Sequence, residues 1–415
     1  MSPAAATVEG VRAMKVLEGI KILDLGRYIA GPFCAALLGD YGADVIRVDR
    51  VGGSEDRLIL PVSENGEGAQ FLQVNRNKRS ISLEIDQPEG QQVLHELVRR
   101  ADVVIANMPP RVLQNLGIDY ESLRRIKPDI ILTASTAFGT APAVRDRVAF
   151  DGVGQAISGA VHLAGLPDHP MKAMVPVVDF ATALSCALGT VMALYERKAS
   201  GMGQEVGASL LQTALNFSSA SLIEEAVLQA DRKATMNRAA QYAPSDIFRA
   251  KDGWFITQVI GPAMFKRWAR LIGRPELVDD PRFQDDLQRG HHGEYLSDLM
   301  SEWCAPMTRA EALAKLEGAR IPAGAVNSPR EVLQDESISA AEPFEMMEYP
   351  GVKTPIPIVK PPIFLSRTPA AVVRRPPLAG EHTNEVLMEI GYSPDAIAQL
   401  SERGIVQQAP GGAAA

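Results

Sequence analysis

Two short apolar runs near the start of the chain, residues 20–25 and 45–48, restrict the folds that this sequence can adopt. A loop with a glycine follows the first run, and Gly31-Pro32 marks the start of a helix that leads to the second run. The pattern predicts a βαβ unit, in which two parallel strands are joined by a helix. Ligands of open parallel sheets bind at the carboxyl ends of the strands.

The alternation of helix and strand continues beyond this unit. We expect a helix capped by Asp86, a strand at residues 103–105 that ends at Asn107, a helix capped by Asp119, and a strand at residues 130–133. Strands separated by helices favour a parallel sheet. The predicted fold class is therefore α/β, with a Rossmann-like parallel sheet in the large domain.

The length of the chain predicts more than one domain, because 415 residues exceed what one ordinary core accommodates. Near residue 222 the charge and aromatic content rise, and beyond about residue 329 the chain becomes rich in proline. We expect the large domain to begin with residues 1–222. A smaller inserted α+β domain would span residues 223–329, and residues 330–415 would form a connector that returns to the large domain.

Composition excludes several classes of protein. Hydrophobic residues make up 46% and charged residues 22%, as in soluble globular proteins, and a net charge of −8 disfavours a general nucleic-acid binder. The widely spaced Cys34, Cys186 and Cys304 indicate reduced thiols and a cytoplasmic location. Residues 1–14 lack a signal peptide's apolar core, no apolar stretch is expected to reach the length that spans a membrane, and the tail at 410–415 should be disordered.

The first strand is not followed by Gly-x-Gly-x-x-Gly, so a nicotinamide or flavin enzyme is disfavoured. Arg50 ends the second strand, where related folds recognise an adenosine ribose and where a cation suits a ribose phosphate. The alternative is an ordinary solvated arginine. The basic cluster Arg76, Lys78 and Arg79 has the same two interpretations, a grip on phosphates or a solvated loop.

Asp179 is the candidate nucleophile. It precedes the strongly apolar residues 183–194, which predict a buried helix, and the helix dipole and free N–H groups should hold its carboxylate ionised. One interpretation makes Asp179 only the cap of that helix. The other uses the carboxylate in covalent acyl transfer. None of the six histidines has the spacing of a His-based metal site, so no metal is expected.

The order of motifs resembles the class III CoA-transferases, the CaiB/BaiF family, which includes the formyl-CoA transferases. The segments that carry the resemblance are residues 17–50, 75–83, 137–139, 150–156, 178–179, 201–204 and 380–383. The resemblance implies an enzyme that moves CoA from an acyl-CoA donor to a free carboxylic acid, with acyl-CoA as a substrate and no prosthetic group. It also implies an interlocked, ring-shaped homodimer.

The resemblance also assigns roles to residues. Asp179 matches the family's nucleophile, and Asp151 matches an acidic residue near it. The positions that match the CoA site are Ala30, Arg50, Lys78, Asn107 and Arg147, with Arg79 beside Lys78.

The chain departs from two groups of relatives. No glycine-rich loop like that of the formyl-CoA transferases appears between residues 222 and 329, which disfavours formate or oxalate as the acid. The racemases of 2-methylacyl-CoA, an alternative function, place a His where Phe150 stands. A further alternative is a CoA-binding protein without catalysis, in which changes to Asp179 would be silent.

Overall fold

The computed structural model describes residues 15–409, so the predictions for residues 1–14 and 410–415 lie outside the described residues. The chain divides into two compact units: unit 1 comprises Met1–Gly154, Ala173–Ser219 and Glu342–Ala415, and unit 2 comprises Gln155–Lys172 and Ala220–Ala341. The main segment of unit 2 thus differs from the predicted 223–329 chiefly at its end. Residues 155–172 join unit 2 because their β-hairpin is bonded to the backbone of Met236.

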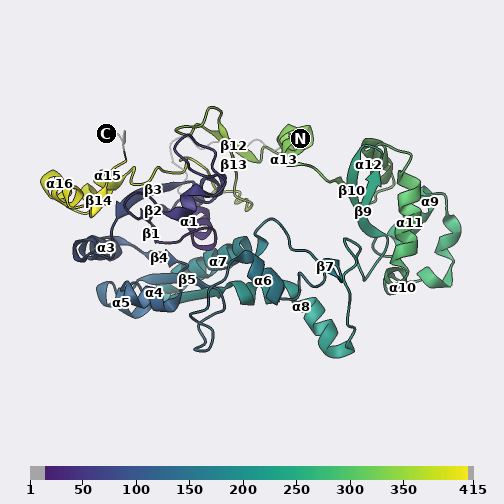
Figure 1. The fold of residues 1–415 in the computed structure, drawn as a ribbon, viewed down its shortest axis with the longest axis horizontal. Coiled ribbons are helices and arrows are strands. Elements are labelled where there is room, and N and C mark those ends of the chain that lie inside the picture. Colours follow the sequence, from purple (N-terminus) through teal and green to yellow (C-terminus); the bar gives the residue numbers. More distant parts are fainter. Residues whose placement is uncertain (1–14, 410–415) are drawn as a thin grey trace. The chain divides into compact units, whose positions relative to one another are not determined.

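Unit 1 is built on a seven-stranded sheet (Figure 1). Its strands, in spatial order, are β14 (Val406–Gln407), β3 (Lys78–Leu83), β2 (Asp44–Asp49), β1 (Lys21–Asp24), β4 (Val103–Ala106), β5 (Ile131–Thr136) and β8 (Glu205–Ser209). Each neighbouring pair is parallel except β14, which runs antiparallel to β3. The prediction of an α/β fold with a parallel-dominated sheet is confirmed. The strand order changes direction between β1 and β4, which makes this the switch point of the sheet.

Helices cover both faces of this sheet because its apolar residues point to both sides. On one face, the helices are α1 (Ala30–Asp40) and α7 (Val177–Ser200), which share a core with Ile22, Val45 and Val103. On the other face, Leu23, Val48 and other strand residues pack against helices from both ends of the chain. These helices are α3 (Pro88–Arg100), α5 (Tyr120–Ile126), α15 (Thr383–Glu389) and α16 (Pro394–Glu402).

One of the two predicted helix caps is confirmed and the other is wrong. Asp119 caps α5 by accepting a hydrogen bond from the backbone N–H of Ser122. Asp86 does not cap α3, because the N-cap residue of this helix is Gln87, whose side chain makes no capping hydrogen bond.

The interpretation of the basic cluster as a solvated loop was wrong, because all six residues of β3, Lys78 and Arg79 included, are buried.

The helix α7 differs from its prediction as well. We expected burial on nearly every side, but only one face packs onto α1, β5 and β8. The opposite face exposes a row of large apolar side chains: Leu184, Leu188, Val191, Met192 and Tyr195. Within residues 15–409, α7 is the one helix whose length and mean hydropathy suffice to cross a membrane, so the expectation that no stretch is long enough was wrong. Its inner face is nevertheless part of the core of unit 1.

Unit 2 combines a small antiparallel sheet with helices. The sheet has the order β11 (Ala323–Ala325), β10 (Gly253–Gln258) and β9 (Ser245–Ala250). Of the aromatic residues that suggested a separate domain, Phe255, Trp268 and Phe283 are almost fully buried in its core and Trp303 packs against it, whereas Trp254 is largely exposed. The helices around this core are α9 (Pro262–Leu271), α10 (Asp286–His291), α11 (Gly293–Cys304) and α12 (Arg309–Gly318).

The remaining elements are short, apart from α8, which continues from unit 1 into unit 2. They are η1 (Glu55–Leu58), α2 (Ala69–Val74), α4 (Pro110–Asn115), α6 (Asp151–Ile157), β6 (Gly165–Leu166), β7 (His169–Pro170), α8 (Leu210–Leu228), η2 (Pro275–Val278), η3 (Pro281–Phe283), α13 (Pro329–Gln334), α14 (Glu336–Ala340), β12 (Phe344–Met347) and β13 (Ile356–Val359). Part of the proline-rich connector forms the β12–β13 hairpin, which packs against Phe71 and Leu72 in unit 1.

Candidate active site

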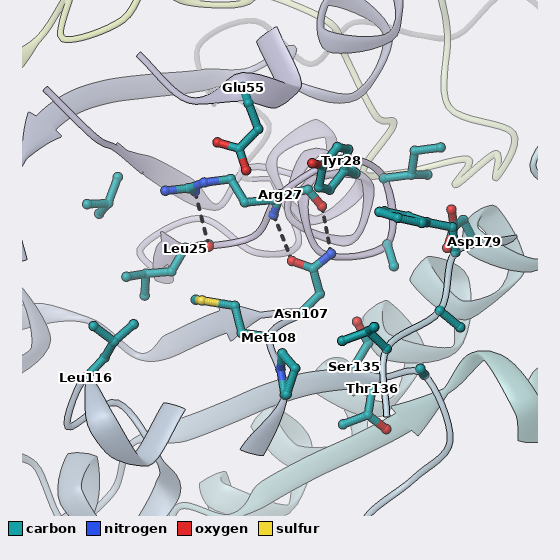
Figure 2. Close-up of a pocket in the computed structure, with 18 of the residues that line it drawn as sticks. Leu25, Arg27, Tyr28, Glu55, Asn107, Met108, Leu116, Ser135, Thr136 and Asp179 are labelled. Atoms are coloured by element: carbon teal, nitrogen blue, oxygen red, sulfur yellow. Dashed lines mark hydrogen bonds between the residues drawn. The ribbon is translucent and has the colours of Figure 1, made fainter. Parts of the chain in front are cut away.

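A cavity of about 340 Å³ opens in unit 1 at the carboxyl ends of the central strands (Figure 2). Leu25 follows β1, Arg50 follows β2, Asn107 follows β4, and Thr136 ends β5; all four line the cavity. Asp179 of α7 lines it from another side. The cavity therefore lies where a doubly wound sheet binds its ligand, at the switch point between β1 and β4.

The structure brings most of the predicted site residues together. Ala30, Arg50, Asn107, Arg147 and Asp179 all line this one cavity. Arg147 places its guanidinium carbon 4.1 Å from the centroid of the Phe138 ring, and Arg50 is exposed at the end of β2. A ligand that extends from Arg50 to Asp179 would thus meet cations and a carboxylate within one cavity.

Lys78 is not part of the cavity lining. Its ammonium group is fully buried and donates hydrogen bonds to Asp24 Oδ2 (2.7 Å), the Pro32 carbonyl oxygen (2.7 Å) and Asn75 Oδ1 (2.8 Å). Burial lowers the pKa of Lys78 to about 8, and the charge of Asp24 opposes this shift. The side chain joins β3 to the chain around α1, which is a structural role.

Arg79 also lies away from the cavity, because it stands near the amino end of β3 and the cavity opens at the carboxyl ends of the strands. Its guanidinium forms 2.7 Å ion pairs with Asp44, Glu385 and Glu389. The geometry thus runs against the expectation that Lys78 and Arg79 bind CoA, since carboxylates and a backbone carbonyl of the chain already satisfy both cations. Sequence patterns did not show that Lys78 and Arg79 are paired, because the carboxylates that pair with them are distant in the chain.

Asp151 and Asp179 meet at the start of α7. Asp151, the first residue of α6, is almost buried, and its Oδ2 accepts hydrogen bonds from the backbone N–H groups of Val178 (2.7 Å) and Asp179 (3.2 Å). The N-cap residue of α7 is Pro176, and Asp179 is the third residue of the helix. The interpretation of Asp179 as a mere cap was therefore wrong, since Asp151 supplies the capping carboxylate.

The expected charge state of Asp179 also needs correction. Burial, and second the charge of Asp151, raise the pKa of Asp179 to about 7. We expected the helix dipole and free N–H groups to keep it ionised, but Asp151 occupies those N–H groups and adds a negative charge beside them. Asp179 is thus a poorly solvated carboxyl group that titrates near neutral pH.

Two residues of the cavity, Tyr28 and Arg27, were missed by sequence reasoning. Tyr28 meets the ring of Phe150 edge-on, with centroids 5.3 Å apart, and its backbone is left-handed, with φ of 62°. Arg27 is paired through its backbone with Asn107: its N–H donates to Asn107 Oδ1 (2.7 Å), and its carbonyl accepts from Asn107 Nδ2 (2.6 Å). Both residues belong to the loop after β1, and their place at the end of a central strand is the only signal that the sequence offered.

A metal centre has no obvious ligands here. Within the part of the chain that the structure describes, His, Cys, Asp and Glu side chains form no group of three or more that would hold a metal ion. All three cysteines are buried and free.

Known proteins are similar to this chain over most of its length. The model of CoA-transferase family III matches residues 17–383. Succinyl-CoA--D-citramalate CoA-transferase of Chloroflexus aurantiacus is 31% identical over 400 residues, covering 95% of this chain and 99% of that protein. Human succinyl-CoA:glutarate CoA-transferase is 32% identical, covering 95% of this chain and 91% of that protein.

A solved structure has the same fold. The crystal structure of a CaiB/BaiF family protein from Brucella suis superimposes with a TM-score of 0.79 and is 30% identical, covering 91% of this chain and 99% of that one. The family model spans both units of the chain, and the two named relatives extend over nearly its whole length. The chain belongs to CoA-transferase family III and is a CoA-transferase.

Proposed function

We propose that the cavity binds an acyl-CoA thioester and that Asp179 is the nucleophile that exchanges CoA between two carboxylic acids. The observation that carries this proposal is the presence of Asp179 in the same cavity as Arg50, Asn107 and Arg147. Arg50 would bind the ribose 3′-phosphate at the carboxyl end of β2, and the acyl group would lie near Asp179. Lys78 and Arg79 are left out of this CoA site.

The reaction begins when an Asp179 carboxylate oxygen attacks the thioester carbonyl of the donor. The C–S bond breaks, which yields an aspartyl–acyl anhydride and CoA thiolate. The thiolate then attacks the aspartyl carbonyl, which releases the donor acid as its carboxylate and leaves an aspartyl–CoA thioester. An acceptor carboxylate attacks this thioester to form a second anhydride, and the released thiolate attacks the acceptor's acyl carbon. The products are the acceptor's CoA thioester and the free Asp179 carboxylate.

The environment of Asp179 supports this role. A carboxylate that is poorly hydrated, as the raised pKa of Asp179 indicates, is a better nucleophile than one in water. Asp151 holds the backbone N–H groups of Val178 and Asp179, so it fixes the first turn of α7 and with it the direction of the Asp179 side chain. Asp151 thus acts as a positioning residue in this proposal.

The relatives suggest where to look for substrates and partners. Both named relatives use succinyl-CoA, so we take succinyl-CoA as the first donor and dicarboxylic acids as the first acceptors. A homodimer is supported by the exposed apolar row on α7, which a second copy of the chain would cover. We place this interlocked homodimer in the cytoplasm.

The proposal is tested by trapping the acyl-enzyme. The wild-type protein is incubated with succinyl-CoA, then other acyl-CoA donors, in the presence of hydroxylamine, and peptides are analysed by mass spectrometry. We expect a hydroxamate on Asp179, and the Asp179→Ala variant should lose transfer to every acceptor while it still binds CoA. An unlabelled Asp179 together with an active variant would overturn the assignment. If Asp179→Ala is inactive but Asp179 of the wild type is not labelled with any of the donors, Asp179 would have a positioning role instead.

A further inference from the structure

Arg27 reaches into the cavity without a carboxylate partner. Its Nη1 donates hydrogen bonds to the carbonyl oxygens of Leu25 (3.2 Å) and Gly26 (2.9 Å), which fix the guanidinium beside the end of β1. Among residues 15–409, Nε and Nη2 have no hydrogen-bond acceptor, and no carboxylate oxygen lies within 4 Å of the group. One edge of the guanidinium is therefore unused.

Nearby arginines of unit 1 behave differently. The buried Arg47, Arg57 and Arg76 each form an ion pair of 2.7 to 2.9 Å with an aspartate. A cation removed from water without a paired anion is costly, so such a group in a cavity calls for an anion from a ligand. Burial and, second, the charge of Arg47 lower the pKa of Arg27, and the charges of Asp49, Asp56 and Asp24, none of them in direct contact with it, oppose this shift.

The position of Arg27 selects the part of the ligand that it would meet. Its reciprocal backbone bonds with Asn107 anchor it at the switch point between β1 and β4. Figure 2 shows the guanidinium extending toward the side of Leu25 and Glu55, away from Asp179. Arg27 thus points away from the place proposed for the acyl group, toward the part of the cavity that would hold the nucleotide of CoA.

We propose that Arg27 binds the 5′-diphosphate of CoA. This inference rests on the proposed function of the cavity and adds a ligand contact to it. The unused Nε–H and Nη2–H donors form the parallel pair with which an arginine chelates phosphate oxygens. The diphosphate links the adenosine, whose 3′-phosphate is assigned to Arg50, to the pantetheine arm that leads to Asp179, and Arg27 follows the central strand between them.

The test measures binding of CoA and of dephospho-CoA, which lacks only the 3′-phosphate, by titration calorimetry. We expect Arg27→Met to weaken both ligands equally, by about 10- to 100-fold, because a charge-assisted bidentate contact is lost in each. Arg27→Lys keeps the charge without the planar pair of donors, so its loss should be smaller. Arg124→Met removes a charge from an exposed position on α5 and should leave both affinities unchanged.

Each other outcome overturns the inference. Wild-type affinity in Arg27→Met would mean that Arg27 meets no phosphate, and a loss confined to CoA would assign it to the 3′-phosphate. Unchanged CoA binding with a raised KM for the acid would place a carboxylate there. The thermal melts of the free variants separate misfolding from lost contacts, and Arg27→Lys decides the case if Arg27→Met does not fold. Failure of the wild type to bind CoA would instead refute the proposed function.

Discussion

The Oδ2 atom of Asp151 lies 3.2 Å from the backbone nitrogen of Asp179 and accepts a hydrogen bond from its N–H group. The same oxygen accepts a hydrogen bond from the N–H group of Val178, so two N–H groups at the start of α7 are already engaged. The Asp179 carboxyl group consequently gains little from the helix terminus and stands near another negative charge. Burial first, and the charge of Asp151 second, raise the pKa of Asp179 to about 7. We therefore expect the activity of the enzyme to depend on pH.

Activity should rise with pH through the range around 7, because in the proposed mechanism Asp179 attacks as the carboxylate and its pKa is raised to about 7. Asp151→Asn retains an oxygen that accepts the two N–H bonds but removes the neighbouring charge, so the pKa of Asp179 should fall. The rising limb of kcat/KM would then move to lower pH. Glu121→Gln, at an exposed position on α5, is the control and should leave the limb in place. A limb that does not move in Asp151→Asn would contradict the coupling.

Arg50 is expected to read the 3′-phosphate. Arg50→Ala should weaken CoA by about 1.5–3 kcal/mol, the range for a hydrogen bond to a charged group, and the loss should shrink at high salt. Titrations with dephospho-CoA provide the comparison, since the penalty should vanish there. Equal losses for the two ligands would remove Arg50 from the 3′-phosphate site.

The enzyme should not exchange the α-proton of its substrate. Racemisation needs two bases on opposite faces of the α-carbon, and Phe150, which stands before Asp151, carries no titratable group. Tyr28 beside it does not replace the base, because burial raises the pKa of its phenol above the ordinary range of a tyrosine. 2-Methylacyl-CoA incubated with the enzyme in D₂O should gain no deuterium, as measured by mass spectrometry. Enzyme-dependent deuteration that follows loss of optical purity would favour the racemase.

Replacing Lys78 should damage folding rather than CoA binding. Lys78→Met leaves the buried carboxylate of Asp24 without its cation, which costs about 3–5 kcal/mol in the free energy of unfolding. Arg124→Met breaks only one long, exposed ion pair with Glu121 (3.7 Å) and should cost less than about 1 kcal/mol. Urea unfolding measures both. Unchanged stability of Lys78→Met combined with weak CoA binding would restore Lys78 to the CoA site.

A charge on the outer face of α7 should break the proposed homodimer. Leu188 is 58% exposed in the middle of the apolar row, so Leu188→Asp would place a carboxylate where the second copy packs. We expect a smaller particle by light scattering coupled to gel filtration. Met388→Asp makes the same change on α15, where the side chain is 53% exposed, and should leave the mass unaltered. An unchanged mass in Leu188→Asp would exclude this face as the contact.

Local sequence patterns were sufficient to predict the strands that are buried on both faces. The apolar runs at residues 20–25, 45–48, 103–105 and 130–133 correspond to β1, β2, β4 and β5, because a central parallel strand consists almost entirely of apolar residues. β3 was missed because its first two residues, Lys78 and Arg79, are buried as ion pairs. Their partners Asp24 and Asp44 lie more than 30 positions away, so no local pattern shows that these charges are neutralised.

The candidate site, too, could be predicted only in part from local sequence patterns. Arg50 and Asn107 lie in the cavity because each follows a predicted strand, although their binding of CoA stays a prediction. The bond from Asp179 to Asp151 joins positions 28 residues apart, and only the fold brings them together. The resemblance placed an acidic residue near the nucleophile, whereas its role as the cap of α7 required the structure.

One edge strand of the sheet is far in sequence from the strand beside it. β14 pairs with β3, and Val386, Leu387, Ile397 and Leu400 from the helices before β14 cover one face of the core built by residues 23–134. When the chain up to Ser219 has emerged from the ribosome, we therefore expect this apolar face of the sheet to be still uncovered. That face stays open while unit 2 is made, since domains emerge in order during synthesis. We therefore expect this face to be prone to aggregation until residues 383–407 have emerged.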